Sequence, residues 1–349
     1  MPETLINPFR GPGLPGAGTL PRDDASGVAR LLTLCPVHAE TPLTALPDLA
    51  RALNIAQLWV KEERARMGLG SFKALGAAHA IACAAAQAVQ NDNWTQALTG
   101  QTFITASAGN HGLSLAAGAR LFGAQAIIYL AETVPDAFAD RLRAKGAQVA
   151  RAGATYEASM QAAEAAAAKG DGTLLSDSSW PGYEDLPLQV MEGYLQLAAE
   201  AAAQIDQPPT HILLQAGVGG LATAIAAHAR AIWGDAPQII VVEPQAAPAL
   251  IGSIRAGALT TSSGPVSNMG RLDCKTPSMI ALAGLARDAD VFVTITEAEA
   301  TAAVDLLARH GMASTPSGVA GLAAVIAGRP TLPPEARVLT ILSEGPEDG

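Results

Sequence analysis

The sequence has few charged and aromatic residues and very little cysteine. Of its 349 residues, 15% are charged and 4% are aromatic, whereas 49% are hydrophobic. A disordered chain combines low hydrophobicity with a high density of charge, so this composition excludes one. At about 150 residues per domain, the length predicts roughly two folded domains.

Basic residues are also scarce. The chain has 22 Lys and Arg against 32 Asp and Glu, which gives a net charge of −10. Phosphate backbones repel a surface of that sign, and no cluster of Lys and Arg along the sequence reverses it. We therefore expect no nucleic-acid partner.

The three cysteines, Cys35, Cys83 and Cys274, match no zinc-site spacing. An odd number cannot pair completely within one chain, which favours a reducing compartment. No apolar run reaches the roughly 18 residues of a membrane span, and residues 1–15 lack the pattern of a signal peptide. These features predict a cytoplasmic protein without a membrane partner.

Short apolar runs alternate with alanine-rich segments along most of the chain. We expect strands at Leu58–Lys61, Thr102–Thr105, Ala126–Leu130, Gln148–Arg151, His211–Gln215, Gln238–Val242 and Val338–Leu342. We expect helices at Phe72–Val89, Leu113–Phe122, Asp136–Lys145, Tyr156–Lys169, Pro187–Gln204, Leu221–Trp233, Glu297–His310 and Gly318–Ala327. This order predicts an α/β fold, with parallel sheets covered by helices on both faces. Residues 1–50 predict an extended arm leading into a short helix near Pro47–Leu53, and Gly252–Gly270 predicts a loop.

A glycine-rich loop, Gly217-Val-Gly-Gly220, follows one expected strand, and Leu221 opens an amphipathic helix. Glycine lets the backbone approach a ligand closely, and the helix start offers free N–H groups, so the pattern is typical of a phosphate cradle. A tight turn with nothing bound is the alternative. The loop lacks the Lys-Ser/Thr of a P-loop, which disfavours ATP or GTP hydrolysis.

A dinucleotide site is a second interpretation of the same loop. The next strand ends near Glu243, and an acidic residue about 20 residues after a glycine-rich turn is typical of NAD-binding folds. The glycine spacing here is not G-x-G-x-x-G, which weakens an NAD-dependent dehydrogenase as the function.

A second loop, Ser107-Ala-Gly-Asn-His111, lies between an expected strand and a helix. Its serine, backbone amides and asparagine suit a carboxylate or phenolate oxygen. The alternative is an ordinary helix N-cap by Ser107 or Asn110.

Lys73 stands in an apolar setting, Ser71-Phe-Lys-Ala-Leu75. Most lysines are solvated surface groups, but burial lowers the pKa of a lysine and makes it a usable amine nucleophile. A phosphate cradle together with such a lysine indicates pyridoxal 5′-phosphate (PLP), which carries both a phosphate and an aldehyde.

Four segments resemble motifs of the diaminopropionate ammonia-lyases, which are PLP enzymes of fold type II, the tryptophan-synthase-β-like group. The lysine motif spans Lys61 to Lys73, with Lys61, Glu63, Arg66, Gly68, Leu69, Phe72 and Lys73 in register. The other segments are the asparagine loop Ser107–Gly112, the segment Asp177-Ser-Ser-Trp-Pro-Gly-Tyr183, which resembles the family's Asp-Thr-x-Trp-x-Gly-Tyr, and the phosphate loop Gln215–Gly220. The resemblance covers about Lys61 to Ser343, most of the chain.

The resemblance implies two doubly wound αβα domains with PLP in the cleft between them. Residues 1–70 and 190–349 would form the larger, phosphate-binding domain. Residues 71–189 would form a smaller, mobile domain that carries the asparagine loop. Homodimers are common among such relatives, so a homodimer is expected.

The resemblance also implies a role for each site residue. Lys73 would bind PLP covalently, Asn110 would contact its 3′-oxygen, and Ser343 would face the pyridine nitrogen. Its phosphate would lie on Gly217, Val218, Gly219, Gly220 and Leu221. The substrate carboxylate would lie against Ser107, Ala108, Gly109 and His111. Asp177 resembles the base for L-substrates, and either Asp177 or the Lys73 amine freed by the substrate would remove the α-proton. A hydroxyl at Ser343 suits β-elimination more than transamination.

Two positions depart from the family pattern. Ala108 replaces the aspartate that is taken as the base for D-substrates, so the loop looks like that of serine and threonine dehydratases. Pro316 replaces a glutamate near the cofactor, so an acidic group is lost at that position.

The sequence thus predicts a PLP-dependent ammonia-lyase that performs β-elimination on an L-amino acid such as 2,3-diaminopropionate, giving a 2-oxo acid and ammonia. A dehydratase acting on serine, threonine or a hydroxyaspartate is the alternative on the same scaffold. A Rossmann dehydrogenase and a non-catalytic PLP-binding protein are more distant alternatives. No ligand set identifies a metal.

Overall fold

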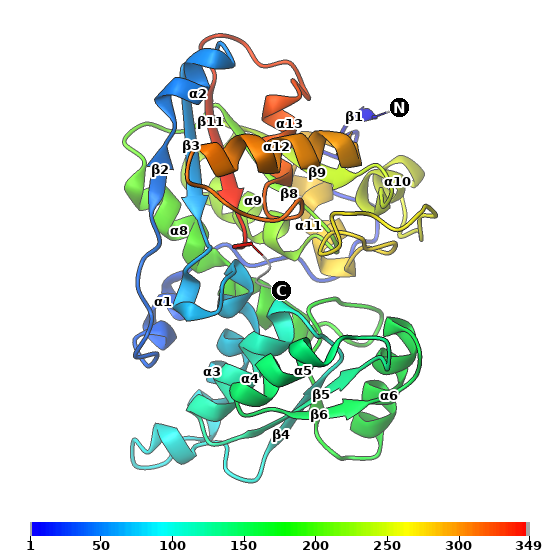
Figure 1. Cartoon of the computed structure of the whole chain (residues 1–349). Helices are drawn as coiled ribbons and strands as arrows, with labels where there is room; N and C mark the ends of the chain where they lie inside the picture. Colours follow the sequence, from blue (N-terminus) through cyan, green and yellow to red (C-terminus); the bar gives the residue numbers. More distant parts are fainter. Residues whose placement is uncertain (1, 347–349) are drawn as a thin grey trace.

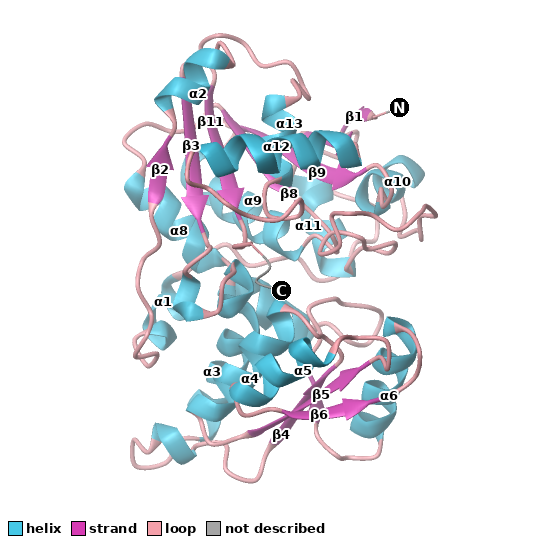
Figure 2. Cartoon of the chain, viewed as in Figure 1, coloured by secondary structure: helices cyan, strands magenta, loops and turns pink. Residues whose placement is uncertain are grey.

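Two β-sheets organise the chain in the computed structural model, which describes residues 2–346 (Figure 1). A seven-stranded sheet occupies the upper part of the view and a four-stranded sheet the lower part, and helices pack on each (Figure 2). This arrangement confirms the expected α/β fold with parallel sheets.

The seven-stranded sheet combines strands from both ends of the sequence. Its order is β1 (Thr4–Ile6), β10 (Val291–Ile295), β9 (Gln238–Pro244), β8 (His211–Gln215), β11 (Arg337–Leu342), β3 (Gln57–Glu62) and β2 (Leu43–Ala45). The two edge strands, β1 and β2, run antiparallel to their neighbours, and the other pairings are parallel.

Helices bury both faces of this sheet, which is why its strands read as continuous apolar runs. Along β8, Ile212 and Leu214 join one core and Leu213 joins the other, because successive side chains point to opposite faces. The first core includes α8 (Leu195–Gln204), α9 (Gly220–Trp233), α10 (Ala249–Ala256) and α11 (Met279–Asp288). The second includes α2 (Pro47–Ala52), α12 (Glu297–Arg309) and α13 (Ala320–Ile326).

The four-stranded sheet is entirely parallel. Its order is β6 (Gln148–Arg151), β5 (Gln125–Leu130), β4 (Thr102–Thr105) and β7 (Thr173–Leu174). The helices α3 (Gly76–Ala88), α4 (Asn110–Leu121) and α5 (Asp136–Ala144) share one core with it. On the opposite face, α6 (Tyr156–Ala168) packs against Ile104.

All seven expected strands are present, but the sequence analysis missed others. The missed elements are β1, β2, β7, β10, α1 (Ser26–Leu32), α10 and α11. The prediction of an extended arm over residues 1–50 is wrong where α1 forms. The prediction of a loop at Gly252–Gly270 is wrong in its first part, because α10 runs to Ala256.

Two expected helices are interrupted. The segment from Phe72 begins as a 3-10 turn, η2 (Phe72–Leu75), before α3. The segment around Tyr194 divides into α7 (Asp185–Gly193) and α8. Within residues 2–346, no helix has the length and apolar character needed to cross a membrane.

Candidate active site

The sequence motifs meet where parallel strands of the large sheet end. The lysine motif begins at the end of β3, the glycine-rich loop follows β8, and Ser343 follows β11. These three strands are neighbours. The N–H of Phe72 donates to the carbonyl of Ser343 over 3.0 Å, which fixes Lys73 beside the end of β11. In open α/β sheets, ligands bind outside the carboxyl ends of the strands.

A buried cluster of charges anchors the segment that leads to Lys73. The guanidinium of Arg66 donates two 2.8 Å bonds to Glu63 and bonds of 2.8 and 2.7 Å to Glu200. Lys61 lies 2.8 Å from Glu200 as well. Two cations and two anions therefore compensate each other away from water, which explains why the motif carries charges at buried positions.

The side chains of Lys73 and Asp177 form a direct ion pair, although they are far apart in sequence. The Asp177 carboxylate holds the pKa of Lys73 above its ordinary value despite the opposing effect of burial. The Lys73 ammonium likewise holds the pKa of Asp177 well below its usual range. The expectation of a lowered lysine pKa was therefore wrong for this structure, because burial comes together with a carboxylate partner.

The rings that follow Asp177 fix the conformation of its segment. Trp180 and Tyr183 stack with centroids 4.3 Å apart. The Tyr183 hydroxyl accepts from the Ser176 N–H (3.0 Å) and donates to the Leu174 carbonyl (2.8 Å). These contacts give a structural reason for the aromatic positions of the motif.

The glycine-rich loop has the geometry of an anion cradle. Gly219 has φ +101° and is the N-cap of α9, so the N-cap residue has no side chain with which to cap that helix. A Cβ at Gly217 would lie 3.0 Å from the Cys274 Sγ. The backbone thus needs glycine here, and the first N–H groups of α9 are available to a phosphate.

Tyr194 and Cys274 are site residues that sequence analysis missed. The Tyr194 ring packs edge-on against Phe72 at 4.9 Å, and a Cβ at Gly220 would touch it at 3.5 Å. Its hydroxyl is buried and has no hydrogen-bond partner within residues 2–346. Burial raises the pKa of the Cys274 thiol to about 11. In the sequence, the signals for this close packing are two glycines: Gly76 faces Tyr194, and Gly217 faces Cys274.

The asparagine loop ends in α4, whose N-cap is Gly109. The alternative of a cap by Ser107 or Asn110 is wrong, because neither side chain caps the helix in the described chain. Instead, the Asn110 amide donates to the Glu344 carboxylate over 2.6 Å. His111 is buried, and its Nε2 lies 2.9 Å from the Leu175 carbonyl.

Glu344 places a carboxylate next to the position where Pro316 replaces an acidic residue. It is 5% exposed, and besides Asn110 it accepts a 2.5 Å bond from the Thr315 hydroxyl. Arg271 lies 3.8 Å away. Glu344, the neighbour of Ser343, was not expected from the sequence, and it places an acidic group beside Thr315 and Pro316.

Glu243 is not available to a nucleotide. It is fully buried, and its carboxylate accepts the N–H groups of Leu250 (2.7 Å) and Ile251 (2.8 Å) at the start of α10. Burial raises its pKa to about 8. The acidic residue on which the NAD-dehydrogenase interpretation depended is therefore a structural helix cap.

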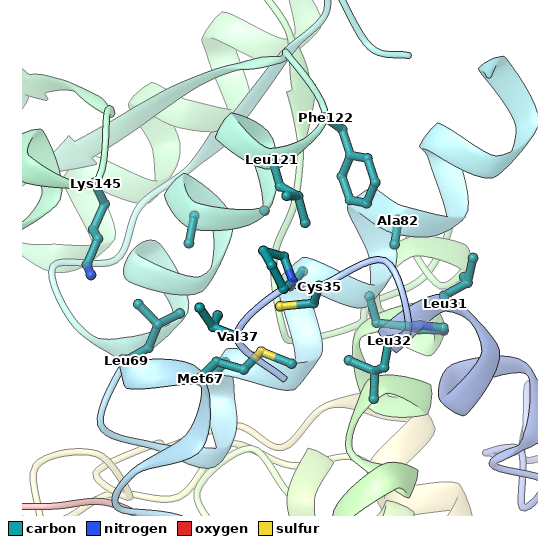
Figure 3. Close-up of a pocket in the computed structure, with 16 residues that line it drawn as sticks. Leu31, Leu32, Cys35, Val37, Met67, Leu69, Ala82, Leu121, Phe122 and Lys145 are labelled. Carbon is teal, nitrogen blue, oxygen red and sulfur yellow. The ribbon is translucent and has the colours of Figure 1, made fainter. Parts of the chain in front are cut away.

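Two cavities lie near these elements. One of about 610 Å³ is lined by Asn110, Leu113 and Arg141 on one side and by Glu344 and Arg271 on the other. A separate apolar cavity of about 270 Å³ lies between α1, α3 and α4, where Leu31, Leu32, Leu121 and Phe122 surround it (Figure 3). Lys73 and Asp177 line neither of these two cavities. Among the described residues, no group of three or more His, Cys, Asp or Glu could hold a metal ion.

Comparisons with known proteins agree with this geometry. The family model described as pyridoxal-phosphate dependent enzyme matches residues 34–344. The diaminopropionate ammonia-lyase of Escherichia coli K12 is 30% identical over 285 residues, which cover 77% of this chain and 71% of that enzyme. The Salmonella typhimurium enzyme of the same name is 32% identical over 235 residues, which cover 62% of this chain and 58% of that enzyme. The crystal structure of the E. coli enzyme in complex with D-serine matches with a TM-score of 0.89 at 26% identity, covering 100% of this chain and 95% of that one.

Proposed function

Because the chain belongs to the family of pyridoxal-phosphate dependent enzymes, we propose that it catalyses β-elimination from a β-substituted L-amino acid such as 2,3-diaminopropionate. The products would be a 2-oxo acid and ammonia. The observation that carries the proposal is the contact between Lys73 and Asp177, an amine and a carboxylate paired beside a glycine-rich anion cradle.

The residues present fit PLP. The uncapped start of α9 suits its phosphate, with Gly217, Val218, Gly219, Gly220 and Leu221 around it. Lys73 would supply the amine for its aldehyde, Asn110 would lie toward its 3′-oxygen, and Ser343 toward its ring nitrogen. When bound, PLP supplies an electron sink for the pair left on the substrate α-carbon after proton removal.

Asp177 serves as the proton acceptor in this proposal. The Lys73 ammonium must lose a proton before its amine can react, and the Asp177 carboxylate is in direct contact with it. A proton that Asp177 takes from Nζ must pass on to water before Asp177 can accept the substrate proton. With Nζ uncharged, the ammonium no longer lowers the pKa of Asp177, so the regenerated carboxylate is a better base.

Ala108 determines the chirality in this proposal. A base must reach the face of the substrate from which the proton leaves. Asp177 is present for one face, and a methyl group stands at the family's second acidic position. The substrate carboxylate would lie on Ser107, Ala108, Gly109 and His111, and L-substrates would react.

A dehydratase is the second candidate on this scaffold. Ala108 gives the loop the Ser-Ala-Gly-Asn-His sequence that resembles serine and threonine dehydratases. In that case hydroxide, rather than an amine, would leave from serine, threonine or a hydroxyaspartate.

The biological setting follows from other features. We propose a homodimer, in keeping with the family. A reducing cytoplasmic location accords with the three cysteines, all of which are free thiols. The domains are proposed at residues 1–70 with 190–349, and 71–189.

Product stoichiometry distinguishes the two leaving groups. Elimination from 2,3-diaminopropionate followed by hydrolysis releases two ammonia molecules for each pyruvate, whereas serine releases one. The PLP-loaded protein should therefore give ammonia and pyruvate in a two-to-one ratio from L-2,3-diaminopropionate, at a higher kcat/KM than from L-serine or L-threonine. A higher kcat/KM for L-serine or L-threonine would assign it as a dehydratase. Absence of turnover with all three would refute the proposal.

A further inference from the structure

Two buried serines join the segment of Asp177 to the rest of the site. The Oγ atoms of Ser179 and Ser278 lie 2.7 Å apart, and the residues are 3% and 0% exposed. Ser179 belongs to the segment after β7 of the four-stranded sheet, two residues beyond Asp177. Ser278 directly precedes α11, a helix of the core beneath the seven-stranded sheet.

Ser179 caps α11 from outside that helix. Its Oγ accepts the N–H of Ile280 over 3.0 Å, and its carbonyl accepts the N–H of Met279 over 3.1 Å. Ser278, the N-cap residue, makes no cap of its own, and its Oγ accepts the Ser179 N–H over 3.1 Å. Each serine thus satisfies a polar group of the other's segment, and breaking the pair would leave buried donors unpaired.

Ser278 also reaches the glycine-rich loop. Its N–H donates to the Val218 carbonyl over 3.0 Å. Hydrogen bonds therefore connect Val218 to Ser278 and Ser278 to Ser179, two residues from Asp177. The loop that suits a phosphate and the segment that carries the carboxylate are mechanically linked.

We propose that Ser179 and Ser278 form a clasp that positions Asp177 relative to the glycine-rich loop. The inference rests on the proposed function, in which Asp177 is the base. Ser179 stands two residues after Asp177 and two positions before Pro181, within the segment whose rings, Trp180 and Tyr183, stack on each other. Both serines are positioning residues, because they act on the reaction through Asp177 and the loop.

The first test compares Ser179→Ala and Ser278→Ala in the PLP-loaded protein. A displaced base slows the chemical step, so kcat should fall about tenfold while KM changes less than about twofold. Ser253→Ala is the matched control. Ser253 is 0% exposed in α10, donates to the Ala249 carbonyl over 2.8 Å and accepts the Thr260 N–H over 3.1 Å. It loses a comparable buried hydroxyl but should keep kcat.

The double variant tests whether the two hydroxyls act as one unit. If they do, Ser179→Ala combined with Ser278→Ala should be no slower than the slower single variant. Independent losses that multiply, or single variants that fold and keep full kcat, would overturn the clasp.

Amide hydrogen exchange tests the link without turnover. Adding PLP to the wild-type apoprotein should slow exchange at residues 217–221 and also at 177–183. In Ser278→Ala, protection should remain at 217–221 and be lost at 177–183. Equal protection of 177–183 in both proteins would contradict the clasp, whereas an inactive protein that shows the predicted pattern would refute only the proposed function.

Discussion

The two sides of the candidate site use different chemistry. On the side of the seven-stranded sheet, the glycine-rich loop offers backbone N–H groups at the start of α9. On the side of the four-stranded sheet, residues 107–111 and 177–183 offer individual side chains. By its resemblance to the ammonia-lyases, the loop keeps the expected sequence, while the other side departs from the expected pattern at Ala108. In the proposed function, cofactor binding therefore depends on backbone geometry, and substrate choice depends on individual side chains.

Removing the Lys73 amine should have the largest effect, because both sides of the site depend on the covalent bond that Lys73 would form with PLP. We expect Lys73→Ala to lower kcat by about a thousandfold or more. Borohydride reduction of the PLP-loaded wild type should fix the label on the peptide containing Lys73, and mass spectrometry can locate it. Lys169→Ala, which changes an exposed lysine after α6, is the control and should retain both label and activity. A label on another lysine would refute the assignment.

A substitution within residues 107–111 or 177–183 should slow the reaction and leave PLP bound. Asp177→Asn keeps the shape of the residue but removes the base, so kcat should fall about a hundredfold. Absorbance titration should show a PLP dissociation constant close to that of the wild type. Full activity in this variant would mean that another group removes the proton.

A substitution in the glycine-rich loop should act by weakening the binding of PLP. An alanine at Gly219 must adopt φ +101°, and its Cβ would lie 2.8 Å from the Ala281 Cβ. A strain of about 1–2 kcal/mol predicts a PLP dissociation constant about tenfold higher, together with a lower Tm. Stability should therefore fall as well as affinity. Gly234→Ala is the control, because Gly234 lies at the other end of α9, also has a positive φ (+56°) and has nothing within 4 Å of an added Cβ, so it should lower Tm without changing PLP affinity. Equal PLP affinity in the two variants would contradict the cradle.

A substitution of Glu243, which lies outside both sides of the site, should affect only the free energy of unfolding. Burial raises the pKa of Glu243 to about 8 from an ordinary value of 4.5. Between these values the folded chain holds a proton that the unfolded chain releases, so the free energy of unfolding decreases as pH rises, by at most about 1.4 kcal/mol per pH unit. Urea unfolding of Glu243→Gln from pH 5 to pH 8 should show a shallower decrease than the wild type. Parallel curves would mean that Glu243 does not titrate in this range.

The backbone side could be predicted from the sequence because its signals are local. Glycine spacing between a strand and a helix indicated the loop at Gly217, and the apolar neighbours of Lys73 indicated an unusual lysine. The strand Val291–Ile295 also carried a readable β-branched run, although it was missed. The edge strands β1 and β2 span three residues each, too few for a periodic pattern.

The side-chain contacts could not be predicted, because they join residues that only the fold brings together. Asn110 and Glu344, or Ser179 and Ser278, have no local pattern that marks them as partners. The Lys73 pKa shows the same point. An apolar sequence setting predicted a lowered value, and the distant Asp177 reverses the direction.

The most direct test of the account is the initial rate of pyruvate release by the PLP-loaded wild type from separate L- and D-2,3-diaminopropionate. The account predicts that the L-isomer reacts at least about tenfold faster, because Asp177 serves its face and Ala108 leaves the other without a base. Ala108→Asp should then raise the rate with the D-isomer. Equal rates for the two isomers in the wild type would contradict the assignment of Asp177 as the base.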